Sequence, residues 1–341
     1  MKAKNVPQGS GKVKSPTLED VAREAGLSPM TVSRALNTPQ IVRAATVEKV
    51  KKAVAVTGYI PNLLAGGLAS KKSKLIAVVV PQINNNMFVD SVQALSDQLA
   101  KRGYHMLLCV SGYTEEVETE IVSAILSRRP DGIVLTGIQH SPEMKRIILS
   151  SGVPVVEIWD LTPTPLDILV GFSHEKIGNK IAQYMHDKGY RKFGLIWTED
   201  RRASVRKKGV IDALESYGDS TVATVTVELP ATLSRGRQGL SQLLDLNQQY
   251  DAIICSSDTL AQGAIIEASA RGLSVPRNLG VIGFGNLDFA QHNVPSISTI
   301  SIDRWRVGID AANMLADKIE GKELAEHVID IGFELIERES S

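Results

Sequence analysis

The chain has 341 residues, of which 43% are apolar and 5% aromatic, and its 38 Lys and Arg balance 38 Asp and Glu. This length exceeds one ordinary domain, and an apolar fraction near the globular average excludes wholesale disorder. No run approaches 18 apolar residues, and residues 1–15 contain no apolar segment. We therefore expect a cytoplasmic protein with neither a membrane span nor a signal peptide.

The net charge of zero conceals a division along the chain. Residues 1–74 contain 13 basic and 4 acidic residues, whereas the remainder contains 25 basic and 34 acidic residues. This asymmetry indicates that the N-terminal fifth contacts a polyanion. Residues 1–16 are predicted to be a flexible basic tail, so the folded part of this region begins at Thr17.

Three short helices are predicted at the start of the folded region. Thr17 is placed to cap the first helix, and Gly26 is placed to end it. Ser28 and Pro29 suit the N-cap and the first position of a second helix, and a third is expected at about 44–56. Two short helices joined by a three-residue turn in a basic unit are typical of a helix-turn-helix.

The second of these helices is the one that would enter the major groove of DNA. Its Arg34 can pair with a guanine edge, and Thr31 and Ser33 can bond phosphates or bases. An alternative is a small helical bundle whose polar face is merely solvated, and helical spacing alone leaves both interpretations open.

The residues themselves are more specific than their spacing. Residues 17–22 (TLEDVA), 26–37 (GLSPMTVSRALN) and 58–62 (GYIPN) resemble the DNA-binding headpiece of the lactose/galactose-repressor (LacI/GalR) family of transcriptional regulators. The resemblance implies that residues 17–60 bind double-stranded operator DNA. The positions it assigns to DNA contact are Thr17, Ser28, Pro29, Met30, Thr31, Ser33, Arg34 and Asn37.

In this family a hinge helix follows the headpiece and inserts a leucine into the minor groove. The resemblance places the hinge at residues 61–73 and the inserted leucine at Leu68. The sequence departs from the family at Gly66 and Gly67, each of which costs a helix about 1 kcal/mol relative to alanine. We therefore expect this hinge to need DNA in order to fold.

From residue 75 onward, short apolar runs alternate with amphipathic stretches, as in 75–81 followed by 89–101. The alternation predicts parallel sheets with helices on both faces, and more than ten elements favour two sheets over one. The predicted fold is thus an all-α helix-turn-helix headpiece followed by an α/β core of two doubly wound parallel-sheet subdomains. Ligands of such sheets bind at the carboxyl ends of the strands.

Motifs of enzymes and metal sites are incomplete in this sequence. Residues 9–13 (GSGKV) end in valine where a phosphate loop needs Ser or Thr, and 174–178 (HEKIG) end in glycine where a zinc protease has histidine. Cys109 and Cys255 lie far apart in apolar segments and are predicted to be buried free thiols. We expect no enzyme, no catalytic residue, no metal and no cofactor.

The resemblance extends to about residue 337 and implies the family's periplasmic-binding-protein-like, effector-binding core over 74–341. The implied N-subdomain comprises about 74–171 and 303–330, and the C-subdomain about 172–301 and 331–341. A solute-binding protein without DNA function would share this core, but the helix-turn-helix argues against that alternative.

The resemblance also assigns an effector site. Arg206 corresponds to the arginine that holds the effector, and Asp160 to an aspartate that faces the sugar. The alternatives are a surface arginine in a basic run at 206, a turn residue at 160 and a core side chain at Phe88. The complete set of assigned positions is Phe88, Asp160, Phe172, Arg206, Ser234, Ser257, Asp258 and Gly285.

Gly285 is the most informative departure from the family, because many members have aspartate there. Removing a buried carboxylate while retaining Arg206 favours an anionic ligand. Residues 156–160 and 331–335 also resemble repressors of gluconate use. We therefore predict a sugar acid, gluconate or a ketogluconate, as the effector; a neutral sugar or a sugar phosphate remains the alternative.

One recognition helix contacts too little DNA for gene-level specificity, so a homodimer on a palindromic operator is expected. Its contacts are predicted in the N-subdomain of the core. An effector that prefers the low-affinity state is an inducer, and one that prefers the DNA-competent state is a corepressor. The sequence leaves both open.

Overall fold

The computed structural model describes residues 15–60, 72–84, 86–246 and 248–341. It divides into two compact units, Met1–Ser73 and Lys74–Ser341. Most of the predicted tail and most of the predicted hinge, with Gly66, Gly67 and Leu68, lie outside the described residues. No helix in the described ranges is long and apolar enough to cross a membrane.

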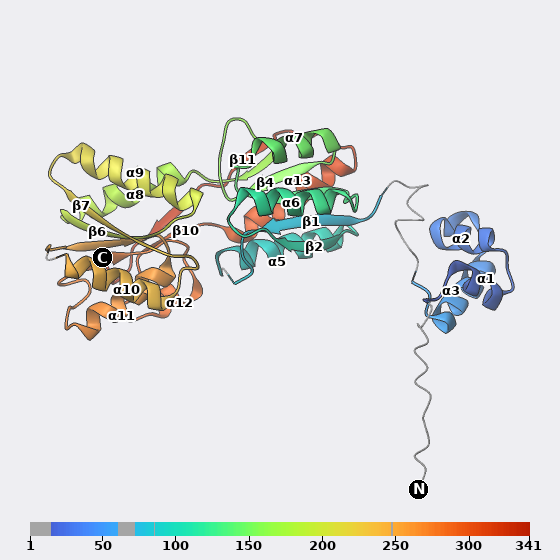
Figure 1. Ribbon diagram of the computed structural model, residues 1–341, viewed down its shortest axis with the longest axis horizontal. Coiled ribbons are helices and arrows are strands. Elements are labelled where there is room, and N and C mark those ends of the chain that lie inside the picture. The colour runs from blue at the N-terminus through green and yellow to red at the C-terminus, as the bar shows by residue number, and fades with distance from the viewer. Residues whose placement is uncertain (1–14, 61–71, 85, 247) are drawn as a thin grey trace, which may run out of the picture. The chain divides into compact units, whose positions relative to one another are not determined.

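The first unit contains the three predicted helices, which are confirmed (Figure 1). Thr17 and Asp20 form a reciprocal cap, in which the Thr17 amide donates to Asp20 Oδ2 at 2.9 Å. Gly26 ends the helix in the left-handed conformation, with φ of 57°. Ser28 Oγ accepts from the Thr31 amide at 3.2 Å and caps the second helix. The elements are α1 (Leu18–Ala25), α2 (Pro29–Asn37), the 3-10 helix η1 (Pro39–Ile41) and α3 (Ala44–Thr57).

The apolar faces of these helices form one small core. Val21 of α1, Val32 of α2 and Val50 of α3 are almost completely buried in it. Because α2 buries only the side that carries Val32 and Ala35, its opposite side remains exposed. The packing therefore leaves a helix face available for DNA.

The second unit begins with a six-stranded parallel sheet in the order β11-β5-β4-β3-β1-β2. Ile76 and Val78 of β1 pack with α5 and α13 on one face, while Ala77 and Val79 pack with α6 and α7 on the other. This N-subdomain comprises β1 (Leu75–Val80), α5 (Asn86–Lys101), β2 (His105–Val110), α6 (Glu115–Leu126), β3 (Gly132–Thr136), α7 (Pro142–Ser151), β4 (Val155–Ile158), β5 (Ile168–Gly171), α13 (Arg304–Ile319) and β11 (Val328–Asp330).

The C-subdomain is built around a four-stranded parallel sheet in the order β7-β6-β8-β9. Side chains of α8 and α9 cover one face, and those of α10 and α11 cover the other. A two-stranded antiparallel sheet pairs β10 with β12. The elements are α8 (His174–Asp187), β6 (Lys192–Thr198), α9 (Arg201–Tyr217), β7 (Thr221–Val227), α10 (Leu233–Asp245), β8 (Ala252–Cys255), α11 (Asp258–Ala270), β9 (Gly280–Ile282), α12 (Asp288–His292), β10 (Thr299–Ser301) and β12 (Glu334–Ile336).

The two sheets confirm the predicted α/β core with helices on both faces of each sheet (Figure 1). The chain passes between them after β5, after β10 and after β11. Because of these crossings, loops that follow strands of both sheets meet between the subdomains.

Candidate functional site

The exposed face of α2 carries side chains suited to DNA contact. Met30 is 65% exposed, and Arg34 is exposed with no ion-pair partner in the described part of the chain. Asn37 Nδ2 donates to Ser33 Oγ at 3.2 Å, which orders the polar side chains at the end of the helix. Ser28, Pro29 and Thr31 lie at its N-terminus, where backbone amides attract phosphate.

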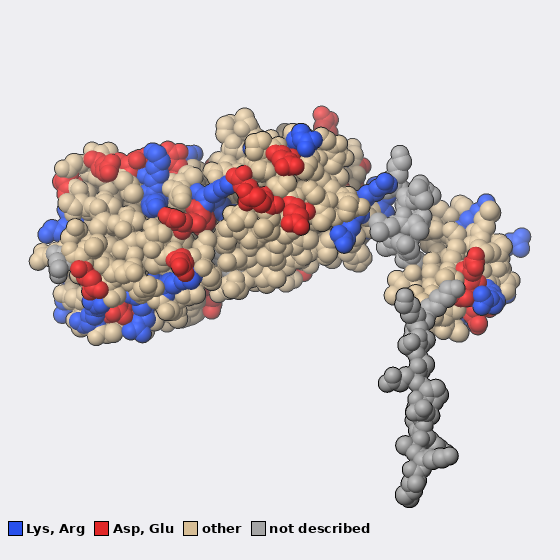
Figure 2. All heavy atoms as spheres, in the orientation of Figure 1, with Lys and Arg blue, Asp and Glu red and all other residues tan. Residues whose placement is uncertain are grey.

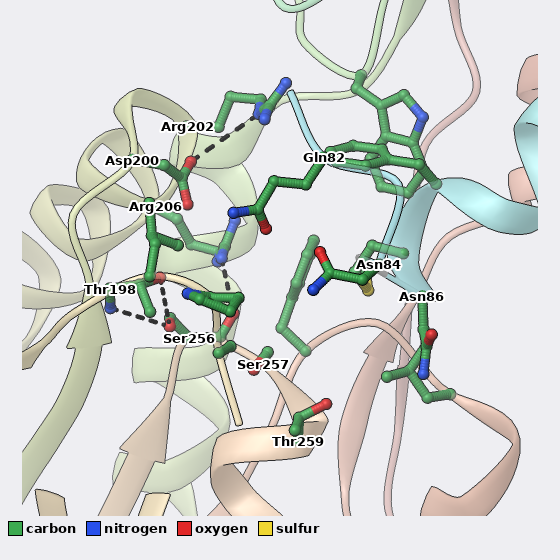
Figure 3. A pocket seen from close by; sticks show the side chains of 18 of the residues that line it. Gln82, Asn84, Asn86, Thr198, Asp200, Arg202, Arg206, Ser256, Ser257 and Thr259 are labelled. Atoms are coloured by element: carbon green, nitrogen blue, oxygen red, sulfur yellow. Dashed lines mark hydrogen bonds and ion pairs between the residues drawn. The ribbon is translucent and has the colours of Figure 1, made fainter. Parts of the chain in front are cut away.

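A cavity of about 160 Å³ lies between the two subdomains (Figure 3). One water needs about 10–15 Å³, so this volume admits a ligand of monosaccharide size. Gln82 follows β1 and Trp159 follows β4, while Ser256 follows β8 and Phe284 follows β9. The cavity thus forms at the carboxyl ends of strands from both sheets, as the sequence predicted for a ligand site.

Arg206, on α9, is the central charged group of this cavity and is only 4% exposed. Its Nη2 donates to the Ser256 carbonyl at 2.9 Å, and its guanidinium carbon lies 3.8 Å from the centre of the Phe284 ring. Burial lowers the pKa of Arg206 to about 10, so the group stays protonated at neutral pH. No carboxylate lies within ion-pair distance of it among the described residues.

Two buried polar atoms of the cavity have no hydrogen-bond partner in the described ranges. One is Arg206 Nε, a donor from the C-subdomain, and the other is Gln82 Oε1, an acceptor from the N-subdomain. In Figure 3 the Gln82 side chain extends from the loop after β1 toward the Arg206 side of the cavity. Because unpaired buried polar groups cost free energy, this pair indicates a ligand that both accepts and donates.

A histidine joins Arg206 to the opposite subdomain. His174 is 3% exposed; its Nδ1 lies 2.9 Å from Arg206 Nη1, and its Nε2 lies 3.0 Å from the Trp159 carbonyl. Burial and the positive charge of Arg206 hold the pKa of His174 well below its usual range. The imidazole is therefore neutral, and it adds no positive charge to the cavity.

A second arginine reaches into the same space. Arg202 Nε lies 3.9 Å from Asp200 Oδ1 (Figure 3). Its guanidinium carbon lies 5.4 Å from the centre of the Phe88 ring. Asn84, Asn86, Thr198 and Thr259 add amide and hydroxyl groups to the lining, and Asp200 adds a carboxylate.

Of the eight positions assigned to the effector site, three line the cavity and five do not. Phe88, Arg206 and Ser257 line the cavity, and Ser257 also caps α11 through the Leu260 amide. Phe172 is fully buried behind the lining, with its ring centre 5.6 Å from that of Trp159. Asp160 lines a neighbouring cavity, and the other three positions lie outside the lining of both cavities.

Asp258, Gly285 and Ser234 do not line the cavity, each for a different reason. Asp258 is buried, and it accepts from the Thr299 hydroxyl at 2.6 Å and the Leu287 amide at 2.8 Å. Ser234 is exposed at the start of α10. A Cβ on Gly285, whose φ is 125°, would lie 2.4 Å from the sulfur of Met87, a lining residue.

Asp160 faces a neighbouring cavity that also contains Glu118, Asp200 and Arg202. Its Oδ1 accepts from the Leu161 amide at 2.8 Å. Burial raises the pKa of Asp160 to about 6, and this outweighs the opposing effects of that hydrogen bond and of Arg202. Asp160 therefore changes charge close to physiological pH.

Sequence reasoning missed Gln82, His174 and Ser256 as site residues. The sequence around His174 matches neither a nucleophile elbow nor a zinc-protease pattern, and Gln82 and Ser256 belong to no motif. The available signal was their position directly after an apolar run, where the carboxyl ends of strands place side chains in a ligand site.

Comparison with known proteins agrees with both units. The family model described as bacterial regulatory proteins, lacI family, matches residues 17–62, and that of the periplasmic binding protein-like domain matches residues 182–341. The HTH-type transcriptional regulator GntR of Pseudomonas aeruginosa is 35% identical over 329 residues, which are 96% of either chain. The chain belongs to the LacI family. It is a DNA-binding transcriptional regulator with an effector domain, and it is not an enzyme.

Solved structures agree with this LacI-family fold. A LacI-family transcriptional regulator from Silicibacter pomeroyi superposes with a TM-score of 0.90 at 30% identity, covering 95% of this chain and 99% of the other. The Lac repressor dimer bound to operator has the same fold, with a TM-score of 0.80 at 24% identity, covering 96% and 99%. The alternative of a solute-binding protein without DNA function is thus wrong.

Replacing Arg34 tests the DNA-contacting face of this LacI-family headpiece. Arg34→Ala should weaken operator binding by about 1–3 kcal/mol and relax specificity at one base pair, because an exposed guanidinium can pair bidentately with guanine. Fluorescence anisotropy on operator, on single-base operator variants and on random DNA measures both effects. An equal loss on random DNA would make Arg34 a phosphate contact instead.

The raised pKa of Asp160 gives a stability signature. The folded state holds the proton up to about pH 6 and the unfolded state only to about pH 4, so the contribution of Asp160 to stability falls as the pH rises through this window. Asp160→Asn removes that titration. The free energy of unfolding of the variant minus that of the wild type should therefore increase by up to about 3 kcal/mol between about pH 4 and pH 7.

Denaturant unfolding of both proteins at a series of pH values measures this difference. Asp258, whose pKa burial also raises to about 6, is common to both proteins and cancels. A difference that stays constant across the series would show that Asp160 titrates normally.

Proposed function

We propose that this regulator is a repressor whose operator affinity is switched by a sugar acid, with gluconate or a ketogluconate favoured. The observation that carries the proposal is the buried, protonated Arg206 with its unused Nε. A buried charge without a counterion is expensive, and a ligand carboxylate would supply the missing charge.

The donors left on Arg206 suit a carboxylate. A guanidinium has five N–H groups, of which two are engaged by His174 and Ser256. The remaining donors include Nε, and a planar carboxylate can accept from a guanidinium through two parallel hydrogen bonds. The neutral His174 adds no positive charge beside Arg206, so the guanidinium itself is the cation offered to such a ligand at this point.

The rest of the cavity suits hydroxyl groups. Gln82 Oε1 needs a donor, and Asn84, Thr198 and Thr259 offer amide and hydroxyl groups along the lining. A polyhydroxy carboxylate provides both a charged end and several donors. Contacts from Gln82 and Arg206 to one ligand would join the two subdomains.

Position 285 and the relatives favour the same class of ligand. Where many family members have aspartate, this chain has Gly285 beside the thioether of Met87, so no carboxylate from that position opposes an anion. The relative GntR is 35% identical, and residues 156–160 and 331–335 resemble repressors of gluconate use. A sugar phosphate is the second candidate, because Arg202 adds another cation to the lining.

The effector is tested by thermal unfolding against gluconate, 2-ketogluconate, 6-phosphogluconate and glucose. A ligand at 100 times its dissociation constant adds about 2.7 kcal/mol to the free energy of unfolding, which is easily seen. Gluconate or ketogluconate should raise the midpoint and glucose should not. Arg206→Ala should abolish the shift, because it removes the only fully buried cation of the described cavity.

Lys208→Ala is the matched control for Arg206→Ala. It removes a positive charge from the same helix at an exposed position that forms an ion pair with Asp212, outside the cavity. Its gluconate shift should equal that of the wild type. A shift with glucose and none with any acid would refute the sugar-acid effector while leaving the regulator intact.

We also propose that the protein binds a palindromic operator as a homodimer through the N-subdomain. Strand β2 lies at the edge of the six-stranded sheet, yet Leu107, Leu108 and Val110 are each more than a third exposed. Figure 2 shows few charged side chains over β2 and α5 on the face displayed. Cys109 lies on the same edge strand; it was predicted to be buried, but it is only partly buried. An uncovered apolar edge strand is an association site.

The dimer prediction is tested at Leu108. Leu108→Asp should weaken self-association at least about tenfold, or about 1.4 kcal/mol, because it places a charge in an apolar contact. Operator binding should fall with it. Analytical ultracentrifugation measures the association, and Leu246→Asp, an exposed leucine of the C-subdomain, is the control that should stay dimeric. An unchanged Leu108→Asp dimer would place the interface elsewhere.

A further inference from the structure

His174 occupies an unusual position between the subdomains. It is the first residue of α8, directly after the crossing from β5, and it is 3% exposed. One ring nitrogen faces Arg206 in the C-subdomain, and the other faces the Trp159 carbonyl in the N-subdomain. The imidazole is therefore a direct polar connection across the cleft.

The hydrogen-bond partners assign the tautomer of His174. A guanidinium has donors and no acceptor, so Nδ1 must accept from Arg206 Nη1 and carries no proton. A carbonyl only accepts, so Nε2 carries the proton and donates to the Trp159 oxygen. A protonated ring would direct an N–H at the guanidinium. The nearby charges, Arg206 and Arg202 on α9, oppose such protonation.

The connection continues into the N-subdomain beyond Trp159. The indole Nε1 of Trp159 donates to Ser91 Oγ at 3.1 Å, and Ser91 Oγ donates to the Phe88 carbonyl at 3.0 Å. Trp159 has φ of 71°, a left-handed backbone conformation that is uncommon for a residue other than glycine. Hydrogen bonds thus join Ser256, Arg206, His174 and the Trp159 carbonyl, and the indole of the same tryptophan continues the connection to helix α5.

We propose that His174 is a positioning residue that orients Arg206 and transmits its movement to the N-subdomain through the Trp159 carbonyl. The inference rests on the proposed function in one respect, namely that Arg206 contacts the effector. A ligand carboxylate that displaces or tightens the guanidinium changes the acceptor geometry at Nδ1. The ring responds as a rigid body, so the change reaches the end of β4.

The tautomer is tested first, on the wild-type protein without any effector. Nitrogen-15 NMR of histidine-labelled protein distinguishes the two neutral tautomers and the imidazolium. The His174 signals should be those of the neutral Nε2–H form from about pH 8 to below the usual histidine pKa. A signal of the Nδ1–H form, or of the imidazolium at neutral pH, would overturn the proposal.

His140 supplies an internal reference for the same spectra. Burial alone would lower the pKa of His140, but hydrogen bonds to Glu118 and Glu157 outweigh it and raise the pKa to about 9. His140 should therefore give imidazolium signals under conditions in which His174 is neutral. Spectra of His174→Asn assign the His174 signals by their loss.

Two substitutions then separate effector binding from its transmission. In His174→Asn the side-chain oxygen can stand where Nδ1 does and accept from Arg206, but nothing reaches the Trp159 carbonyl. This variant should therefore lose less gluconate affinity than a variant without an acceptor, while the factor by which gluconate changes its operator affinity should be at least about tenfold smaller than in wild type. His174→Phe keeps the ring but no acceptor, so it should lose gluconate affinity as well, at least about tenfold.

Calorimetry with gluconate and anisotropy with operator provide the two readouts. If His174→Asn responds to gluconate as fully as wild type, the Trp159 contact transmits nothing and the proposal is wrong. If wild type itself ignores gluconate, the proposed effector fails, and the NMR tautomer decides the His174 assignment independently.

Discussion

The effector core depends on one buried positive charge. Arg206 can be buried because α8 and α9 approach closely at two glycines: a Cβ on Gly178 would lie 2.3 Å from the Arg206 carbonyl, and one on Gly209 would lie 2.7 Å from the Glu175 carbonyl. This contact places the N-terminus of α8, with His174, beside the guanidinium. The aromatic ring of Phe284 and the Ser256 carbonyl complete a site that holds the charge without neutralising it.

Because the chain crosses between the subdomains three times, strand ends from both subdomains surround the cavity that contains Arg206. Since β1 and β4 end on one side of the cavity and β6, β8 and β9 end on the other, each ligand contact belongs to a particular subdomain. A ligand that binds residues of both subdomains necessarily favours one relation between them. Differential affinity for two such arrangements is all that a regulator needs to change its affinity for DNA.

The parts of the fold that the sequence predicted are those with strong local signals. The capped helices around Thr17 and Ser28 and the apolar strand β1 were found because caps and continuous apolar runs are local. Strands β5, β10, β11 and β12 have three or four residues each and were not assigned as strands, and β7 (TVATVTV) mixes polar and apolar residues at a sheet edge. These particular strands become recognisable only through their partners in the sheets.

The sequence by itself determined the helix-turn-helix and the two-sheet core, because these follow from residue spacing and from motifs that resemble one family, and the same resemblance pointed to Arg206. Only the tertiary structure decided which side chains share a cavity. It brought Gln82 and His174 to Arg206 and placed the sulfur of Met87 beside Gly285, and it directed Asp258 into hydrogen bonds with Thr299 and Leu287. The physical reason is that each contact joins segments far apart in the chain, and the packing of two sheets sets their distance.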